Sequence, residues 1–410
     1  MKKLIVPLIL ISCLAIVVGC AGAPEVIQSY LYFTGTDGIN GYELWKTDGT
    51  QAGTVMVKDI YTGTTSSGPS YLTNVNGTLY FRADDATNGY ELWKSDGTEA
   101  GTVLVKDIYT GTTASSIQYL TNVNGTLYFR ANDGDSGNEL WKSDGTDAGT
   151  VRVKDIRPGL PGPDPIYLAN VNGTLYFQAN DGTNGRELWM SDGTEAGTVM
   201  VKDINPAEGT DSSPRELANV NGTLYFSAND GDSGNELWKS DGTPEGTEMV
   251  KDIYEGVGNS SMPRILTNVN GTLYFNAYDG TNGYELWKSD GTETGTVMVK
   301  DINPDSLSSS PNELTNVNGT LYFNATDATY GAELWMSNGT EVGTVMVKDI
   351  NPDSASSDPY ELTNFNGTLF FGAQDGIHGF EPWKSDGTGD GTVMIKDLVE
   401  GDGNGIPGPG

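Results

Sequence analysis

A sequence unit of about 48 residues, repeated in tandem, constrains this chain more than any other feature. The chain has eight tryptophans, and they follow one another at almost equal intervals, one in each unit. Repeats of this length form arrays in which one small unit stacks on the next, because no single unit can bury its own apolar face. We therefore expect the tryptophans to form the core between units, because a buried indole removes a large area from water. They are Trp45, Trp93, Trp141, Trp189, Trp238, Trp287, Trp335 and Trp383.

Each unit has the pattern of strands joined by tight turns. In the second copy, Asn76-Gly77 is the pair that a two-residue type I′ hairpin prefers, because both positions need a positive φ. After this turn, apolar and polar residues alternate from Thr78 to Ala83, which is the period of a strand. The unit shows no helical period, so a four-stranded antiparallel sheet is predicted.

Eight such sheets predict an all-β fold, a β-propeller with eight blades of about four antiparallel strands over residues 29–400. An open, linear β array is the alternative, but its apolar ends would need caps that the sequence does not show. The first copy lacks the strand and turn that should precede Tyr30. Either residues 24–28 supply a substitute strand or one blade stays incomplete. Residues 401–410 are predicted to be a tail rich in glycine and proline.

The first residues predict export. Lys2 and Lys3 precede an apolar run, which is the pattern of a signal peptide over residues 1–19. The run ends at Cys20 after small residues and resembles the lipobox of prokaryotic lipoproteins. That resemblance implies lipidation of Cys20, a tether over residues 20–28 and a protein anchored at the cell surface or outer membrane. A plain secretory signal with an incidental cysteine is the alternative.

Charge and rare residue types exclude several classes of function. The formal net charge of -32 argues against nucleic acid as a partner, because phosphate binding needs a basic surface. The chain holds one histidine, His378, and two cysteines, Cys13 in the signal and Cys20 at the anchor. A catalytic triad, a histidine zinc site and a thiol nucleophile are therefore excluded.

One phrase in the unit resembles a known repeat family. Residues 43–54 read Glu-Leu-Trp-x-x-Asp-Gly-Thr-x-x-Gly-Thr, and near-identical phrases recur in the other copies. This pattern resembles the ELWxxDGT repeat family of secreted and surface proteins of prokaryotes. The resemblance implies a propeller-like β fold on exported proteins and no defined reaction.

Each unit also carries an aspartate that precedes a glutamate at a fixed short spacing. Carboxylates and turn carbonyls are the ligands that Ca²⁺ prefers, so the pairs are candidate calcium sites. An aspartate that caps its own turn through backbone N–H groups is the alternative. The pairs are Asp37 and Glu43, Asp85 and Glu91, Asp133 and Glu139, Asp181 and Glu187, Asp230 and Glu236, Asp279 and Glu285, Asp327 and Glu333, and Asp375 and Glu381.

The position after the repeated phenylalanine varies between copies and is mostly polar, so we expect it on an accessible blade face that binds a ligand. The candidates are Arg82, Arg130, Gln178, Ser227, Asn276 and Asn324. The sequence predicts a monomeric, non-enzymatic surface lipoprotein, a scaffold or adhesion module for an extracellular protein or glycan, which meets the membrane only through its lipid. The alternative is a carbohydrate-active enzyme, a glycosidase or lyase, that uses carboxylates at one propeller face.

Overall fold

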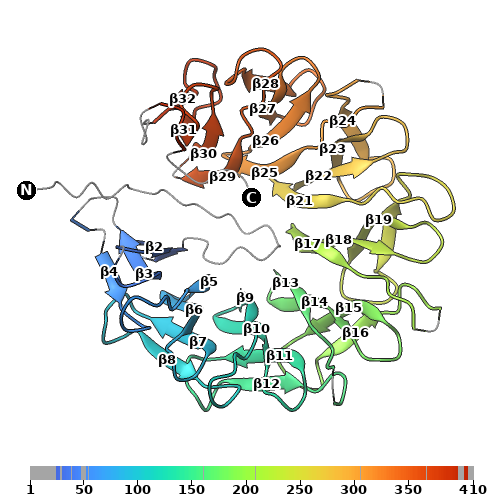
Figure 1. The fold of residues 1–410 in the computed structure, drawn as a ribbon. Helices are drawn as coiled ribbons and strands as arrows, with labels where there is room; N and C mark the ends of the chain where they lie inside the picture. Colours follow the sequence, from blue (N-terminus) through green and yellow to red (C-terminus); the bar gives the residue numbers. More distant parts are fainter. Residues whose placement is uncertain are drawn as a thin grey trace, which may run out of the picture. The chain divides into compact units, whose positions relative to one another are not determined.

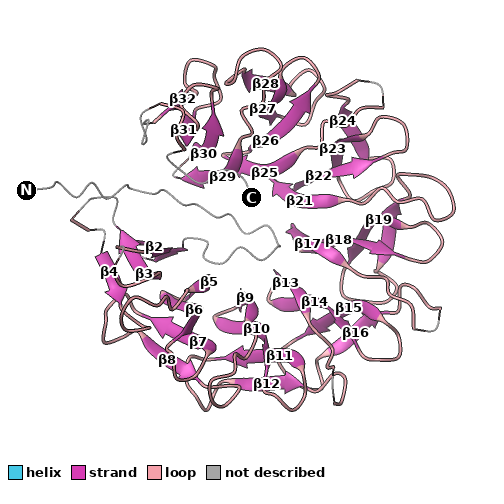
Figure 2. Ribbon diagram, viewed as in Figure 1, coloured by secondary structure: helices cyan, strands magenta, loops and turns pink. Residues whose placement is uncertain are grey.

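A computed structural model describes residues 25–27, 30–37, 39–47, 52–53, 55–159, 161–207, 209–304, 306–365, 367–395 and 401–404. The regular structure of these residues is β-strand throughout, as Figure 2 shows. The described part of the chain has no helix long and apolar enough to span a bilayer. The predicted signal peptide, Cys20 and most of the tether lie outside the described residues.

The strands form eight four-stranded antiparallel sheets, and in each sheet the four strands follow chain order. This confirms the predicted fold class, an all-β propeller of eight blades. The chain divides into two compact units, residues 1–214 and 215–410, which are described separately (Figure 1).

The first unit holds four blades. Their strands are β1 (Glu25–Ile27), β2 (Tyr30–Gly35), β3 (Glu43–Thr47) and β4 (Val55–Lys58); β5 (Ser70–Val75), β6 (Thr78–Asp84), β7 (Tyr90–Ser95) and β8 (Val103–Lys106); β9 (Gln118–Val123), β10 (Thr126–Asn132), β11 (Asn138–Ser143) and β12 (Val151–Lys154); and β13 (Ile166–Val171), β14 (Thr174–Asn180), β15 (Arg186–Ser191) and β16 (Val199–Lys202).

The second unit holds the other four blades. Their strands are β17 (Arg215–Val220), β18 (Thr223–Asn229), β19 (Asn235–Ser240) and β20 (Glu248–Lys251); β21 (Arg264–Val269), β22 (Thr272–Tyr278), β23 (Tyr284–Ser289) and β24 (Val297–Lys300); β25 (Asn312–Val317), β26 (Thr320–Asp327), β27 (Gly331–Ser337) and β28 (Val345–Lys348); and β29 (Tyr360–Phe365), β30 (Thr368–Gln374), β31 (Phe380–Ser385) and β32 (Val393–Met394).

The first blade is completed by a substitute strand, as one of the two sequence-based expectations required. Strand β1 pairs antiparallel with β2, with Glu25 opposite Tyr32 and Ile27 opposite Tyr30. Residues that were assigned to the tether therefore contribute the missing edge of this blade.

The hairpins and the first strands depend on positive φ angles. Asn76 and Gly77 have φ values of 53° and 85°, which confirms the type I′ geometry expected between β5 and β6. A second feature was not predicted: the register between these strands shifts between Ser70 and Thr73, and Tyr71 inside the shift has a φ of 57°. The same bulge recurs in the first strands of later blades.

The hydrophobic core lies between neighbouring blades. Trp93 of the second blade is 6% exposed and belongs to one buried cluster with Leu44 and Tyr32 of the first blade and Phe81 of its own. Equivalent clusters recur within both units. The tryptophans of the second to eighth blades are all buried, whereas Trp45 of the first blade is half-buried.

In five of the described blades, the first, second, third, fifth and sixth, a lysine also makes a polar contact to the Asp-Gly-Thr or Asn-Gly-Thr turn of the next blade. Lys46 of the first blade donates from Nζ to the carbonyl of Gly97 in the second blade, at 2.8 Å, and Lys94 bonds Gly145 in the same way. The hydroxyl of Tyr32 lies against Gly97, where a Cβ would overlap it. Glycine is therefore required at this turn for two reasons: the φ angle is positive, and the preceding blade approaches too closely for a Cβ.

We predict that Gly97→Ala destabilises the protein more than Gly77→Ala. The two glycines have nearly equal φ values of 86° and 85°, so an alanine is strained at both by about 1–2 kcal/mol. A Cβ at Gly77 meets nothing within 4 Å, whereas a Cβ at Gly97 overlaps Tyr32 and adds about 1–3 kcal/mol. Urea unfolding of both variants measures the difference, and equal losses would contradict the packing at Gly97.

Candidate functional site

The glutamate of each acidic pair is a buried anchor for the segment that leaves its blade. Glu91 on β7 is fully buried. Its Oε2 accepts hydrogen bonds from the Ile108 N–H at 2.9 Å and from the Ser115 hydroxyl at 2.7 Å, and its Oε1 accepts the Ser115 N–H at 3.1 Å. One carboxylate therefore holds the end of the fourth strand and the connection to the next blade.

The same anchor occurs in six of the described blades. Burial is the main cause that raises the pKa of these carboxyls, to about 7 in Glu91, Glu187, Glu236, Glu285 and Glu333. Sequence reasoning missed the serine partner, although a serine follows each of these glutamates at an almost constant separation along the chain. The pairs are Glu43 and Ser67, Glu91 and Ser115, Glu187 and Ser212, Glu236 and Ser261, Glu285 and Ser309, and Glu333 and Ser357.

The third blade departs from this arrangement. Pro163 stands at the position that the serine has in the other copies, and proline has neither an N–H nor a hydroxyl to donate. Oε1 of Glu139 is buried with no hydrogen-bond partner among the described residues, and Oε2 accepts the Ile156 N–H at a long 3.4 Å. Burial raises the pKa of this carboxyl to about 8.

The aspartate of each acidic pair caps its own turn. Oδ1 of Asp85 accepts the N–H groups of Thr87 and Asn88 at 2.9 and 2.8 Å, and Oδ2 accepts the Asn88 amide at 2.8 Å. Burial by itself would raise the pKa of Asp85, but these hydrogen bonds outweigh it and the pKa lies below its usual value. Aspartate and glutamate thus serve separate networks, and no three acidic, histidine or cysteine side chains of the described residues gather as a metal site. The geometry favours the turn-capping alternative over calcium.

The expected recognition positions are mostly buried clamps, so the expectation of an accessible face is wrong for four of them. Gln178, Ser227, Asn276 and Asn324 are 3%, 1%, 8% and 8% exposed. Gln178, Asn276 and Asn324 donate their amides to the carbonyl of the proline before the next blade, at 3.1, 2.9 and 3.0 Å. An amide side chain at this position therefore reaches the backbone of the connection and satisfies its carbonyl, whereas the buried hydroxyl of Ser227 has no partner among the described residues.

Arg82 and Arg130 are different, because they are too long for this clamp and are half-buried. The guanidinium of Arg82 lies against the rings of Tyr71 and Tyr90, with its Cζ 5.2 and 4.8 Å from the two ring centroids. Arg130 stacks at 5.4 Å on Tyr119. These two arginines are the predicted recognition residues that the structure leaves at the surface of a blade.

The residue at the bulge of the first strands differs between the two units. The first unit has a tyrosine at this position in three blades, and the rings of Tyr119 and Tyr167 lie 6.3 Å apart. The second unit has Glu216, Ile265, Glu313 and Glu361. Within each unit these strands lie side by side, β5 beside β9 and β9 beside β13 in the first, and β17, β21, β25 and β29 in order in the second. We call the series of residues 71, 119, 167, 216, 265, 313 and 361 the bulge row.

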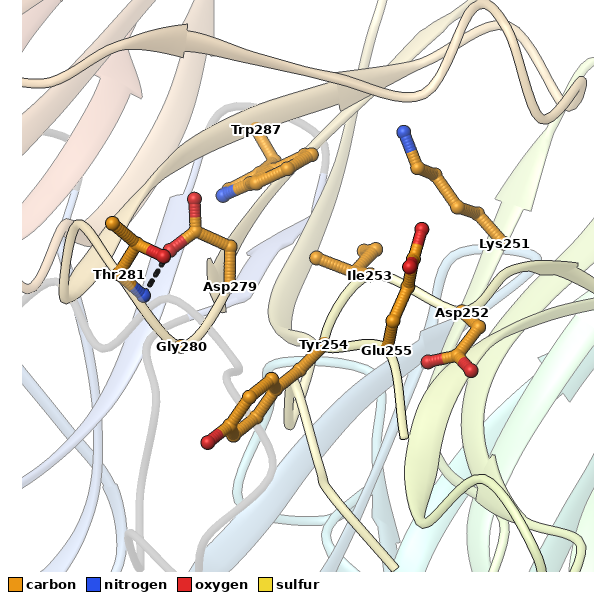
Figure 3. A pocket seen from close by; sticks show the side chains of 9 residues that line it. All are labelled: Lys251, Asp252, Ile253, Tyr254, Glu255, Asp279, Gly280, Thr281 and Trp287. Carbon is orange, nitrogen blue, oxygen red and sulfur yellow. Dashed lines mark hydrogen bonds between the residues drawn. The ribbon is translucent and has the colours of Figure 1, made fainter. Parts of the chain in front are cut away.

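A shallow pocket of about 380 Å³ opens between the fifth and sixth blades. Figure 3 shows Asp279 on one side of the Trp287 indole and Asp252 and Glu255 on the other. Burial is the first cause that raises the pKa of Asp252, whereas hydrogen bonds from Asn282 and Thr281 overcome the effect of burial and lower that of Asp279. The pocket thus holds two carboxyls whose pKa values shift in opposite directions.

Comparison with known proteins finds structural neighbours at low sequence identity. No protein-family model matches the chain, and no curated protein matches it. A prolyl endopeptidase structure superposes with a TM-score of 0.48 at 15% identity, over 80% of this chain and 49% of that one. Prolyl oligopeptidase B from Galerina marginata has a TM-score of 0.44 at 12% identity, over 80% and 50%. A puromycin hydrolase has a TM-score of 0.42 at 12% identity, over 87% and 58%.

This chain therefore spans about half the length of the solved structures that it matches. Likeness at this level of identity concerns the fold alone and carries no substrate or reaction to this chain. The class that the structure defines is an eight-bladed, all-β propeller.

We predict that the protein is more stable at pH 5 than at pH 8 and that Glu139 contributes to the difference. The Glu139 pKa is about 8 when folded, above its ordinary value of 4.5, so the folded state binds more protons. The contribution of Glu139 to the free energy of unfolding is therefore fully present below about pH 4.5 and is lost as the pH rises towards 8. Glu139→Gln should stabilise the protein at pH 8 by roughly 2 kcal/mol relative to its effect at pH 5.

Urea unfolding at the two pH values measures this coupling. Glu99→Gln, a change at an exposed turn residue, is the matched control and should show no such dependence. An effect of Glu139→Gln that is the same at pH 5 and pH 8 would mean that this carboxyl ionises normally in the folded protein.

Proposed function

We propose that this chain is an exported, lipid-anchored propeller that acts as a non-enzymatic scaffold or adhesion module for an extracellular protein or glycan. The observation that carries the proposal is that some repeated residues have a structural role while others are available for binding. The repeated carboxylates accept hydrogen bonds from nearby backbone N–H groups, as Glu91 and Asp85 show. In the bulge row, Glu216 and Glu313 also accept backbone N–H groups, whereas the first unit has tyrosines at the equivalent positions. A constant framework with varied residues at equivalent positions suits recognition.

The chemistry of the bulge row supports a binding role. Tyr71, Tyr119 and Tyr167 are half-buried and present aromatic surface with a polar tip, which suits contacts to sugars and to protein side chains. These bulky residues are held at φ values of 57° to 58°, a conformation that costs free energy for any residue with a Cβ. Positions of this kind often have a role in binding.

The proposed location rests on the sequence. The apolar run before Cys20 favours export, and the small residues around that cysteine favour lipidation. The net charge of -32 suits a soluble domain exposed outside the cell and disfavours nucleic acid.

A carbohydrate-active enzyme is the second candidate, and the pocket of Figure 3 is the observation that favours it. Glycosidases use a pair of carboxyls whose environments push their pKa values apart, as those of Asp252 and Asp279 are pushed. The pocket is shallow, and the aspartates in it recur in the other blades as turn and strand-end residues.

We predict saturable binding of the exported protein on an array of glycans and extracellular proteins. Tyr119→Ala combined with Tyr167→Ala should weaken binding roughly ten-fold or more, because buried aromatic side chains dominate most interfaces. Tyr330→Ala, at a tyrosine that is 40% exposed and outside the bulge row, is the control. Unchanged binding in the double variant, or no ligand at all, would contradict the proposal. Release of new reducing ends from a bound glycan would favour the enzyme instead.

A further inference from the structure

Arg82 carries a charge that the described part of its own blade does not compensate. Its guanidinium lies against the rings of Tyr71 and Tyr90, and its Nε donates to the Ser70 hydroxyl at 3.0 Å. Among the described residues, no carboxylate forms an ion pair with Arg82. The N–H groups of a guanidinium lie in its plane, so a group that stacks on aromatic rings binds a further partner along its edge.

The third blade shows what this edge binds. Arg130 is the equivalent of Arg82 in the next repeat, and it stacks on Tyr119 as Arg82 stacks on Tyr71. Its Nη1 donates to Oδ1 of Asp164 at 2.7 Å, and its Nη2 donates to Oε1 of Gln118. In the third blade the protein therefore supplies an internal carboxylate to the stacked arginine.

The second blade has small neutral residues in place of these two acceptors. Ser116 follows Arg82 at the same separation along the chain as Asp164 follows Arg130. Ser116 and Asp164 have similar positive φ values of 56° and 51°, so the backbone has the same left-handed conformation at these two equivalent residues. Ser70 likewise stands where the third blade has Gln118. The second blade thus has the arginine and the stacking tyrosine of the third blade, and a second ring, Tyr90, where the third has Asn138, but it lacks the carboxylate.

We propose that the edge of Arg82 binds the carboxylate of an acidic saccharide, a uronate residue. The site deepens the proposed binding function and rests on it. A guanidinium edge pairs with a carboxylate through two parallel hydrogen bonds, as planar geometry favours. The hydroxyls of Ser116, Tyr71 and Tyr90, residues that are half-buried, are neutral groups suited to the hydroxyls of a sugar. A single carboxylate on an otherwise neutral sugar meets less repulsion from a chain of net charge -32 than an acidic peptide does.

The test is calorimetric titration of the full exported protein with a glucuronate-containing disaccharide, its neutral glucose analogue and acetate. We expect saturable binding of the glucuronate compound and binding of the other two that is roughly ten-fold weaker or worse. Arg82→Gln should weaken binding by a similar factor. Arg152→Gln removes the same charge from a half-buried arginine of the third blade, paired with Asp155, and should leave binding unchanged.

Two further variants use the comparison between Arg82 in the second blade and Arg130 in the third. Ser116→Asp should place a carboxylate on Arg82, as Asp164 does on Arg130, and so abolish binding while the protein stays folded. Asp164→Ser combined with Gln118→Ser should free Arg130 and raise the stoichiometry from about one to about two sites per chain.

Several results would overturn the inference. Equal binding of acetate would reduce the site to a carboxylate site without sugar recognition, and equal binding of the neutral disaccharide would remove the role of the charge. Binding that survives Ser116→Asp would place the ligand elsewhere. If the glycan and protein array shows ligands but Arg82→Gln changes none of them, only this site fails; if the array shows no ligand, the proposed binding function fails with it.

Discussion

The rest of the structure depends on the hydrogen bonds between a buried glutamate of the blade and the connection that leaves the blade. A connection joins the fourth strand of each sheet to the first strand of the next sheet. This connection is irregular, and some of its backbone N–H groups form no hydrogen bond to a neighbouring strand. Glu91 accepts those of Ile108 and Ser115, and it is itself fully buried. Burying a carboxyl is costly unless hydrogen bonds satisfy it, so the anchor and the connection require each other.

This constraint explains which parts of the molecule the sequence predicts. The repeat of Trp93 and its equivalents predicts stacked blades, and Asn76-Gly77 predicts the hairpin, because each follows from a local rule of burial or backbone geometry. From the sequence alone the glutamate was a candidate calcium ligand. Its serine partner is distant along the chain, and only the fold brings the two residues together. The bulge at Tyr71 also escaped prediction, because neither tyrosine nor its equivalents favours a positive φ by itself.

The candidate recognition site was predicted only in part, for a physical reason. The residue after the repeated phenylalanine varies, and variation indicates either a binding surface or a contact that several polar residues can make equally well. Gln178 and Asn276 make the second kind, a hydrogen bond to the next connection. Arg82 and Arg130 are too long for that contact, so their guanidinium groups stack on tyrosines instead. The difference between the two kinds is visible only when burial and partners are known.

The near-identity of the blades makes their differences informative. Pro163 in place of serine leaves Glu139 without the two serine donors, and Ser116 in place of aspartate leaves Arg82 without the counter-ion that Arg130 has. Each change can be compared with the same strands of another blade within one molecule. A framework of this kind allows single blades to acquire separate chemistry while the others preserve the fold.

Carbon-13 NMR titration of the glutamate side-chain carboxyls tests the central claim most directly. If these glutamates are the buried anchors of the blades, a group of signals that includes Glu91, Glu187, Glu236, Glu285 and Glu333 should titrate near pH 7, apart from the exposed glutamates. Titration of all glutamates near their ordinary value of 4.5 would show that these carboxyls are solvated, and would contradict the account of how the blades are held together.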